Sequence, residues 1–290
     1  MEVIKAETAG FCMGVGLALR RLEAAILEYR AEREENGAGR LYTLGPIIHN
    51  PQLVREYEER GAICLKDPEQ AVSGDTVVIR AHGLPFEVEN ALLERGVKII
   101  DATCPKVKSA QVSIRKAYEA GKGELLLFGE SEHPEVKGLL SYAGSGSRVF
   151  GSLEELAALG LKAGEHYFLA AQTTQDKSIF TDIENYVRTI LGEDITVLKT
   201  ICDATRERQA EVIRLADSVR GMVIVGGLNS GNTTRLAEIS RAKGIFTVHC
   251  ENGDKLPLDE LRRLQPVGLS AGASTPDEQI QEVEDILRKA

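Results

Sequence analysis

Three cysteines stand where an apolar, strand-like run of residues gives way to a helix-like run. The clearest case is Cys104, which lies between the apolar run 97–100 and a helical pattern over 107–120. Cys12 and Cys202 stand at junctions of the same kind. The free N–H groups and the dipole at a helix N-terminus favour the thiolate, which is the form of cysteine that binds metal. Three thiolates on separate loops can therefore hold one shared metal centre.

The spacing of these cysteines indicates an internal repeat. Cys12 and Cys104 are 92 residues apart, and Cys104 and Cys202 are 98 apart (104 − 12 and 202 − 104). A strand–cysteine–helix pattern at nearly equal spacing predicts three related α/β units. The sequence has neither the paired C-x-x-C of most zinc sites nor the closely spaced cysteines of an electron-transfer iron–sulfur motif. Three ligands would leave one iron of a cluster open to substrate.

Histidines and a glutamate follow other predicted strands. His49, His82 and His133 each lie in a loop after such a strand, and Glu135 is close to the last of them. In parallel α/β sheets the functional groups gather beyond the carboxyl ends of the strands, so these side chains should share a face with the cysteines. Imidazoles there suit anion binding or acid–base chemistry. Glu135 would be a proton donor if a dry pocket raised its pKa.

A loop of glycine, serine and asparagine, 228–232, runs into a helix that we expect to begin at about Thr233. Backbone N–H groups at such a helix start bind anions readily. Plainer interpretations apply elsewhere: Cys64 and Cys250 lie within predicted strands and are expected to pack in the core. Each cysteine at a junction, taken singly, is also compatible with core packing, and each loop histidine with a structural role.

The elements that must position these residues alternate between strand and helix, which predicts βαβ units around parallel sheets. We expect three α/β domains, at 1–100 with Cys12, at 101–198 with Cys104, and at 199–290 with Cys202 and a C-terminal segment that returns to the centre. The predicted strands are 41–45, 62–65, 76–81, 97–100, 125–129, 148–150, 167–171, 222–227, 246–250 and 267–270, together with the strand-like runs that lead to Cys12 and Cys202. The predicted helices are 17–35, 52–60, 86–95, 107–120, 153–159, 203–219 and 276–289, with two more that begin near 134 and 233.

Composition narrows the class of protein. The chain has 290 residues and a net charge of −9, which disfavours a nucleic-acid binder and requires any anion pocket to be local. No apolar run approaches the roughly 20 residues of a membrane span, and the N-terminus has no signal-peptide pattern. Five scattered cysteines make a poor disulfide framework and fit a reducing compartment. We therefore expect a cytoplasmic protein that binds neither nucleic acid nor membrane.

The sequence resembles the 4-hydroxy-3-methylbut-2-enyl diphosphate reductase family, which catalyses the last step of the methylerythritol phosphate pathway of isoprenoid biosynthesis. The resemblance covers nearly the whole chain and implies a trefoil of three pseudo-repeated α/β domains around one [4Fe-4S] cluster. It rests on these motifs: GFCMGV (10–15), IIHNP (47–51), AHG (81–83), DATCPKV (101–107), HPEV (133–136), QTT (172–174), ICDATRERQ (201–209), NSGNTTRLAEI (229–239) and AGAS (271–274).

The resemblance also implies roles for single residues. Cys12, Cys104 and Cys202 would be the cluster ligands, and the substrate oxygen would bind the open iron. Glu135 would donate a proton, Thr173 would orient the substrate oxygen, and His133 would line the catalytic pocket. The substrate-binding residues would be His49, His82, His133, Thr173, Ser230, Gly231, Asn232 and Ser274. Gly231 stands where many members have a second serine, so there a backbone N–H would replace a hydroxyl.

The implied reaction is a reductive dehydroxylation of (E)-4-hydroxy-3-methylbut-2-enyl diphosphate. Two electrons and two protons would give isopentenyl and dimethylallyl diphosphates and water. The implied partners are this small allylic diphosphate and an electron donor such as ferredoxin or flavodoxin. The sequence leaves monomer and homodimer both open.

Three other functions stay open at this stage. A non-redox lyase of the quinolinate synthase kind would also use three cysteines and an open iron, but it needs no external electrons. An iron–sulfur electron carrier or sensor would coordinate all four irons and would lack an anion pocket. A zinc-binding structural module would contain zinc without sulfide.

Overall fold

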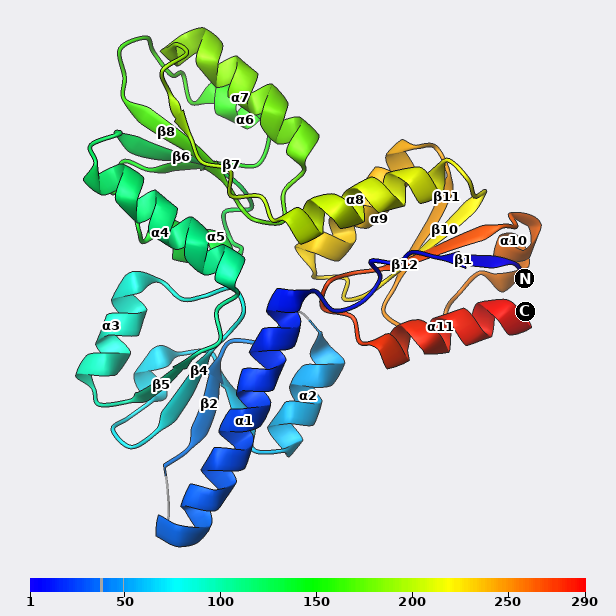
Figure 1. Cartoon of the computed structure of the whole chain (residues 1–290), viewed down its shortest axis with the longest axis horizontal. Helices are drawn as coiled ribbons and strands as arrows, with labels where there is room; N and C mark the ends of the chain where they lie inside the picture. Colours follow the sequence, from blue (N-terminus) through cyan, green and yellow to red (C-terminus); the bar gives the residue numbers. More distant parts are fainter. Residues whose placement is uncertain (37–38, 49) are drawn as a thin grey trace. The chain divides into compact units, whose positions relative to one another are not determined.

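The computed structural model describes residues 1–36, 39–48 and 50–290. The strands of this described part form three four-stranded sheets, and every pairing between them is parallel (Figure 1). The α/β class and the three repeated sheet units predicted from the sequence are therefore confirmed. The chain divides into two compact units: the terminal unit is Met1–Gly16, Ile48–Leu53 and Asp203–Ala290, and the central unit is Leu17–Ile47 and Val54–Cys202.

The terminal unit contains one sheet of strand order β1-β12-β10-β11. Its strands are β1 (Val3–Lys5), β10 (Gly221–Val225), β11 (Phe246–Cys250) and β12 (Val267–Ala271). Its helices are α8 (Asp203–Ala216), α9 (Gly231–Ala242), α10 (Leu258–Arg263) and α11 (Asp277–Lys289). Helices α10 and α11 pack on one face of the sheet, while α8 and α9 pack on the other. Because both faces are covered, β10 is apolar throughout apart from its first glycine.

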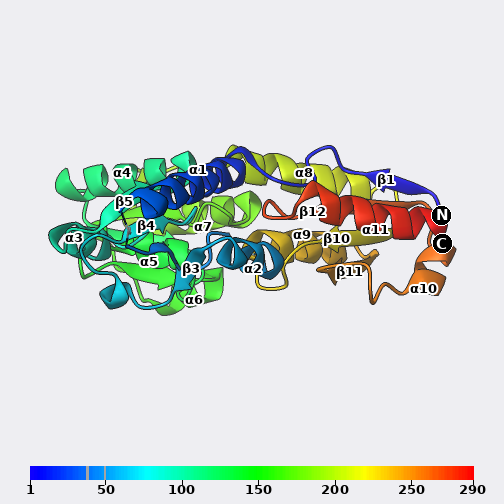
Figure 2. The same ribbon diagram turned by 90° about the horizontal axis from the view of Figure 1, so that it is seen from below.

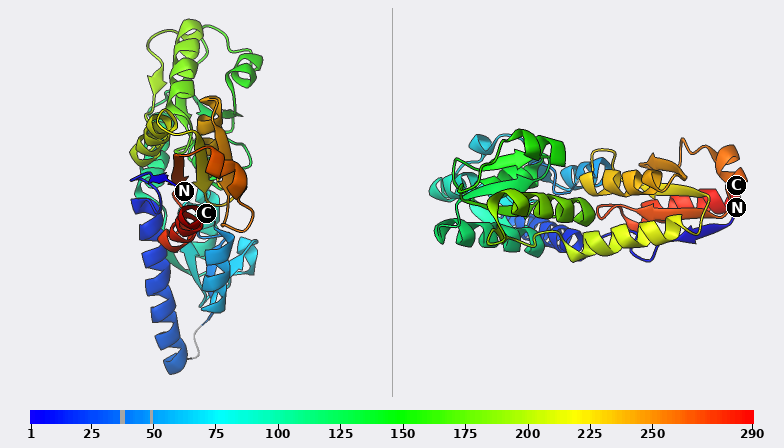
Figure 3. Two further views of the ribbon diagram at one scale, coloured as in Figure 1. Left: turned by 90° about the vertical axis from the view of Figure 1, so that its right-hand side faces the viewer. Right: turned by 90° about the horizontal axis from the view of Figure 1, so that it is seen from above.

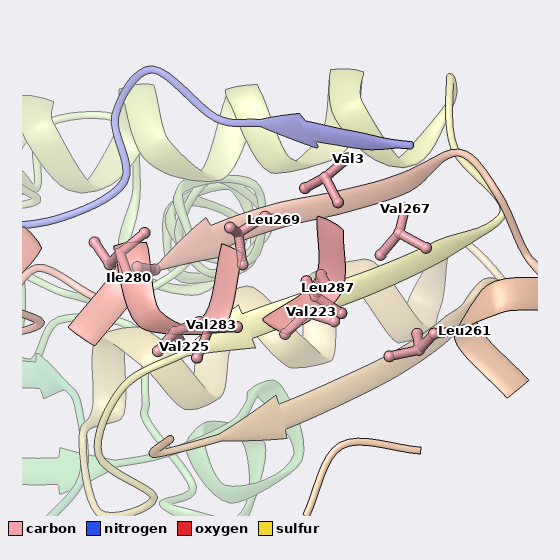
Figure 4. Close-up of a cluster of buried hydrophobic side chains, with 10 residues drawn as sticks. Val3, Val223, Val225, Leu261, Val267, Leu269, Ile280, Val283 and Leu287 are labelled. Carbon is pink, nitrogen blue, oxygen red and sulfur yellow. The ribbon is translucent and has the colours of Figure 1, made fainter. Parts of the chain in front are cut away.

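One of the two cores of this unit is drawn in Figure 4, where Val3, Val267 and Leu269 lie toward α11. The N-terminal ammonium donates to the carbonyl oxygen of Leu287, 3.1 Å away. The two chain ends therefore lie side by side in this unit (Figures 2 and 3). The first strand of the chain is thus fixed by its last helix.

The first sheet of the central unit has the order β3-β2-β4-β5. Its strands are β2 (Leu41–Leu44), β3 (Ala62–Leu65), β4 (Thr76–Ile79) and β5 (Lys98–Asp101). The helices connected with it are α1 (Met13–Asn36), α2 (Pro51–Glu59), the 3-10 turn η1 (Pro68–Gln70) and α3 (Phe86–Glu94). Helix α3 packs on one face through Leu92. Helix α1 lies beside β5, where Lys98 pairs with Glu28 and Glu32 at 3.0 and 3.1 Å.

The second sheet of the central unit has the order β7-β6-β8-β9. Its strands are β6 (Glu124–Phe128), β7 (Arg148–Phe150), β8 (Tyr167–Ala171) and β9 (Thr196–Val197). Its helices are α4 (Pro105–Glu119), α5 (Pro134–Leu140), α6 (Leu153–Ala158) and α7 (Lys177–Leu191). Helices α4 and α5 cover one face, and α6 and α7 cover the other.

The three sheets share one strand order, which explains the repeat seen in the sequence. In both sheets of the central unit the chain places its second strand, first strand, third strand and fourth strand side by side. In the terminal unit β11, β10 and β12 follow the same order, and β1 takes the fourth place. The strands in the fourth place, β1, β5 and β9, are those that lead to Cys12, Cys104 and Cys202. Each cysteine therefore lies where the chain leaves one sheet for the next.

The division into domains at 1–100, 101–198 and 199–290 stays a prediction, but one element differs from it. Strand β1 was expected in the first domain, yet it pairs with β12 from Val3↔Val267 to Lys5↔Leu269. The pairing joins the two ends of the chain, and no local pattern of residues encodes such a partner. Strands β4 and β10 also end two residues earlier than predicted, at Ile79 and Val225.

Helices α7 and α10 were not predicted from the sequence. The signals of α7 are plain in retrospect: the carboxylate of Asp176 accepts the N–H groups of Ser178 and Ile179 at 2.7 and 3.0 Å, which is a helix N-cap. Phe180 and Ile183 then follow at the spacing of a buried helix face. No helix in the described part of the chain is long and apolar enough to cross a membrane.

Candidate active site

Glu135 and Thr173 form a closed pair inside the central unit. Glu135 lies in the first turn of α5, after β6, and Thr173 lies two residues after the end of β8. The backbone N–H of Thr173 donates to Oε1 of Glu135 at 2.6 Å, and the Thr173 hydroxyl donates to Oε2 at 2.9 Å. The Glu135 side chain is only 2% exposed. Both carboxylate oxygens therefore have a fixed partner on the neighbouring strand end.

The environment of Glu135 raises the pKa of its carboxyl group. Burial raises the pKa of this carboxyl group to about 7, although the two hydrogen bonds from Thr173 act in the opposite direction. The negative charge of Glu130 raises it slightly further. A carboxyl group with a pKa near the working pH can both hold and release a proton. This is the shift that the sequence suggested for a dry pocket.

His133 and His82 lie next to each other in the central unit. The side chain of His133 is the N-cap of α5, because its Nδ1 accepts the backbone N–H of Glu135 at 3.1 Å. This bond leaves Nε2 as the nitrogen that can carry a proton and donate. The ring of His82 meets the ring of His133 edge to face, with 5.4 Å between the centroids. This ring contact brings together the loops that follow β4 and β6, which belong to different sheets.

Glycine is required beside His82. Gly83 has a φ of +73°, and a Cβ there would lie 2.6 Å from the side-chain nitrogen of Gln111. Only glycine combines this conformation with such close packing. The turn that presents His82 therefore depends on the AHG motif found in the sequence.

Cys104 and Cys202 are both attached to this region by their backbones. Cys104 is the N-cap residue of α4, with Pro105 next, and its N–H donates to the carbonyl oxygen of Ala81 at 2.9 Å. The N–H of Cys202 donates to the carbonyl oxygen of Thr173 at 2.9 Å. Both cysteines are partly exposed and form no disulfide. The central unit thus collects two cysteines, two histidines, the acid and its threonine at strand ends.

Cys12 lies in the terminal unit at the start of α1. Its Sγ accepts the backbone N–H of Val15 at 3.4 Å, so the sulfur occupies the place of an N-cap side chain. Its own N–H donates to the carbonyl oxygen of Ala273, 3.3 Å away. A sulfur at a helix start lies near the positive end of the helix dipole. This agrees with the chemistry expected of the junction cysteines.

The start of α9, in the same unit, contains three of the residues predicted to bind an anion: Ser230, Gly231 and Asn232. Ser230 is the N-cap, and its Oγ accepts from the N–H and the hydroxyl of Thr233 at 3.4 and 2.9 Å. Gly231 is the first residue of the helix. Asn232 comes next, is 7% exposed, and neither its Oδ1 nor its Nδ2 has a hydrogen-bond partner among the described residues. A buried amide without partners at a helix N-terminus indicates a place for a polar ligand.

Ser274 follows β12 and is tied to a residue that the sequence analysis did not single out. Nδ2 of Asn50 donates to the carbonyl oxygen of Ser274 at 3.2 Å. Oδ1 of Asn50 accepts the N–H groups of Gln52 and Leu53, both at 3.1 Å, and so caps α2. Asn50 could have been found from its place before Pro51, since asparagine is a preferred N-cap. His49, the predicted site residue before it, lies outside the described residues.

Every predicted site residue except His49 lies within the described part of the chain. Within the described chain no three His, Cys, Asp or Glu side chains cluster as a metal site, and Cys12 belongs to a different unit from Cys104 and Cys202. Cys64 and Cys250 lie in β3 and β11 as expected, and burial raises the pKa of the Cys250 thiol to about 12 and also raises that of Cys64. These two thiols are therefore poor metal ligands.

Gln172 is a further residue of the site that was quoted only as part of a motif. It is fully buried, and its Oε1 accepts the N–H of Glu130 at 3.0 Å, while its Nε2 donates to the hydroxyl of Thr174 at 3.1 Å. The loop after β6 is thereby fixed to the loop after β8. Gln172 thus helps to hold Glu135 and Thr173 at their observed separation.

The family model of LytB protein matches residues 3–288. The 4-hydroxy-3-methylbut-2-enyl diphosphate reductase of Nitratidesulfovibrio vulgaris (strain DSM 19637 / Miyazaki F) is 56% identical over 288 residues, with 99% of both chains covered. That of Aquifex aeolicus (strain VF5) is 40% identical over 291 residues, with 100% of this chain and 96% of the relative covered.

Two solved structures agree with this. One is of (E)-4-hydroxy-3-methyl-but-2-enyl diphosphate reductase, the terminal enzyme of the non-mevalonate pathway. It matches with a TM-score of 0.69 and 39% identity, and the match covers 100% of this chain and 99% of that one. The E-1-hydroxy-2-methyl-but-2-enyl-4-diphosphate reductase of Plasmodium falciparum is 22% identical and shares the fold, with a TM-score of 0.90 over 99% of this chain and 87% of that one. The chain therefore belongs to the LytB protein family, as its sequence motifs indicated, and it is an oxidoreductase.

Proposed function

We propose that this protein reduces (E)-4-hydroxy-3-methylbut-2-enyl diphosphate to isopentenyl and dimethylallyl diphosphates and water, with two electrons and two protons. The observation that carries the proposal is the buried Glu135, bonded through both oxygens to Thr173 and with a pKa of about 7. Loss of an allylic hydroxyl group as water needs a proton at the departing oxygen. Glu135 holds a proton at the relevant pH, and the Thr173 hydroxyl lies beside it to orient that oxygen.

The diphosphate would be held by hydroxyl, amide, backbone N–H and imidazole groups. Ser230, Gly231, Asn232 and Ser274 of the terminal unit would supply hydroxyl groups, a backbone N–H and an amide. His49, His82 and His133 would supply imidazoles. Support comes from the unpartnered amide of Asn232 at the start of α9 and from the Nε2 of His133, which its bond to Glu135 leaves as a donor. An acidic protein can thus bind an anion through local donors.

The residues that would hold a [4Fe-4S] cluster are Cys12, Cys104 and Cys202. None of the three forms a disulfide, all three are partly exposed, and each follows a strand and precedes a helix. The chemistry of the set fits: thiolates are the usual cluster ligands, and the sulfur of Cys12 already accepts a helix N–H. When bound, the cluster would supply the electrons and a Lewis-acidic iron that weakens the carbon–oxygen bond. A donor such as ferredoxin or flavodoxin would deliver the electrons.

The test uses anaerobically purified protein with its iron and sulfide measured. The reduced form of a one-electron dye is mixed with the protein, 4-hydroxy-3-methylbut-2-enyl diphosphate is added, and dye oxidation is followed. We expect two electrons to be consumed per substrate molecule. Cys104→Ser should lower the rate at least about a thousandfold together with the iron content, because removal of a cluster ligand removes the site of electron transfer. Cys64→Ser, a cysteine change within a strand, should keep both.

A preparation with full iron and sulfide that oxidises no dye on addition of substrate would overturn the reductase. A non-redox lyase that uses the same three cysteines would then explain the protein better. Loss of iron and rate in Cys64→Ser as well as in Cys104→Ser would contradict the assignment of the ligands instead.

A further inference from the structure

The segment after β9 is held to β8 by one side chain, Thr200. Strand β9 ends at Val197, and the N–H of Leu198 still donates to the carbonyl oxygen of Leu169 at 2.8 Å. Two residues later the regular ladder has been replaced by the hydroxyl of Thr200. This hydroxyl accepts the N–H of Ala171 at 2.9 Å and donates to the carbonyl oxygen of Ala171 at 2.6 Å. The Thr200 residue is 8% exposed, so water does not readily take its place.

The contact leads directly to the reacting groups. Ala171 is the last residue of β8, two positions before Thr173. Thr200 is two positions before Cys202, whose N–H donates to the carbonyl oxygen of Thr173 at 2.9 Å. Thr173 in turn bonds Glu135 through its N–H and its hydroxyl. Thr173 is therefore held on one side by the acid and on the other by the segment that Thr200 fixes.

We propose that Thr200 is a positioning residue for the reaction. Its hydroxyl fixes the segment 198–202 to the end of β8 and so sets the place of Cys202 relative to Thr173 and Glu135. The inference rests on the proposed function, because it takes Cys202 as a cluster ligand and Glu135 as the acid. Thr200 acts on those side chains indirectly, through Ala171 and Thr173.

The physical reason is that the backbone of Ala171 depends on this hydroxyl. An apolar side chain at position 200 would leave the buried N–H and the buried carbonyl group of Ala171 without that hydrogen-bond partner. Because unpaired buried groups are costly, we expect the segment 198–202 to shift or water to enter. A shift of about 1 Å at a catalytic group lowers rates by about a hundredfold. The hydroxyl, more than the bulk of the side chain, is therefore the feature that counts.

Two substitutions separate the hydroxyl from the packing. Thr200→Val keeps the branched shape and removes the hydroxyl, whereas Thr200→Ser keeps the hydroxyl and removes the methyl group. Thr43→Val is the matched control, since Thr43 is also buried in a sheet of the central unit, in β2, where its side chain bonds to Cys64. Thr200→Ala serves as a second hydroxyl-free variant if the valine variant does not fold.

The measurements are made on anaerobic holoenzyme with its iron content determined. They are kcat and KM, the electron paramagnetic resonance spectrum of the reduced cluster, and hydrogen exchange of the peptide that contains residues 198–202. For Thr200→Val we expect kcat to fall about 10- to 100-fold with KM within about twofold, and exchange of the peptide to rise about tenfold. The spectrum should change as well. Thr200→Ser and Thr43→Val should resemble the wild type in all of these.

The outcomes distinguish this inference from the function on which it rests. Wild-type protein that contains iron and sulfide but does not reduce the substrate means that the proposed function is wrong. An active wild type with a Thr200→Val variant that matches Thr43→Val in exchange, spectrum and kcat overturns the role of Thr200 alone. A defect in Thr200→Ser as large as that in Thr200→Val would also overturn it, because the effect would then come from packing.

Discussion

Glu135 in the central unit and Asn232 in the terminal unit differ in whether their polar side-chain atoms have hydrogen-bond partners. Glu135 uses both of its oxygens for bonds to Thr173, at 2.6 and 2.9 Å. Asn232 is about as deeply buried, yet its amide oxygen and nitrogen have no partner among the described residues. Both side chains stand near the start of a helix that follows a parallel strand.

The difference shows two ways in which one arrangement of strand and helix is used. At α5 the proposed proton donor, Glu135, is held in place before substrate binds, so that under this proposal no rearrangement would be needed when the bond to oxygen breaks. At α9 it leaves donors and an acceptor buried and unused, which is costly unless a ligand completes them. The first region should therefore determine the rate of the chemical step, and the second should determine affinity.

The largest effect is expected from Glu135→Gln, which removes the proton and keeps the shape. We expect kcat to fall by about 10²–10⁴ while KM changes little, since general acids contribute about this much to a rate. Steady-state kinetics with the reduced dye measure both constants. Glu130→Gln, which removes an exposed carboxylate of the same loop, should leave kcat near the wild-type value at pH 6. A large rise in KM for Glu135→Gln would place this residue in substrate binding instead.

Asn232→Ala should give the next largest effect. In this variant KM should change and kcat should stay nearly the same, the reverse of Glu135→Gln. Loss of hydrogen bonds to a charged ligand costs about 1.5–3 kcal/mol, so KM should rise about 10- to 100-fold while kcat stays within a few-fold. Asn252→Ala is the control: Asn252 is an exposed asparagine of the same unit, and its side chain accepts the N–H of Asp254. An unchanged KM in Asn232→Ala would contradict the comparison made above.

The smallest effect concerns pH. An acid must be protonated to act, and the pKa of Glu135 is raised to about 7, chiefly by burial. The rate should therefore be constant below that pH and fall about tenfold per unit above it. Glu130 contributes to the raised pKa through its charge, so Glu130→Gln should move the inflection to lower pH. A pH–rate profile of both proteins measures this shift, and an inflection that stays in place or moves upward would refute it.

Much of the fold followed from local signals in the sequence. Apolar runs, glycines and prolines act within a few residues of their own position, and they placed most strands and helices, with the cysteines, His82, His133 and Glu135 at strand ends. Helix α7 was missed although Asp176 and Phe180 carried the usual signals for it. The failure to predict α7 was therefore an error of interpretation. The local signals were present, and the tertiary structure agrees with them.

By itself, the sequence determined the α/β class, the threefold strand–cysteine–helix pattern and the family, because each depends on residue types in order along the chain. The tertiary structure alone decided which distant residues meet. Strand β1 joins β12 over 264 residues (267 − 3), Asn50 reaches Ser274 over 224, and Thr200 reaches Ala171 over 29. In each of these contacts at least one partner is a backbone group, of a kind that nearly every residue carries. Their partners are therefore fixed only when the sheets have packed and the loops have been brought to their ends.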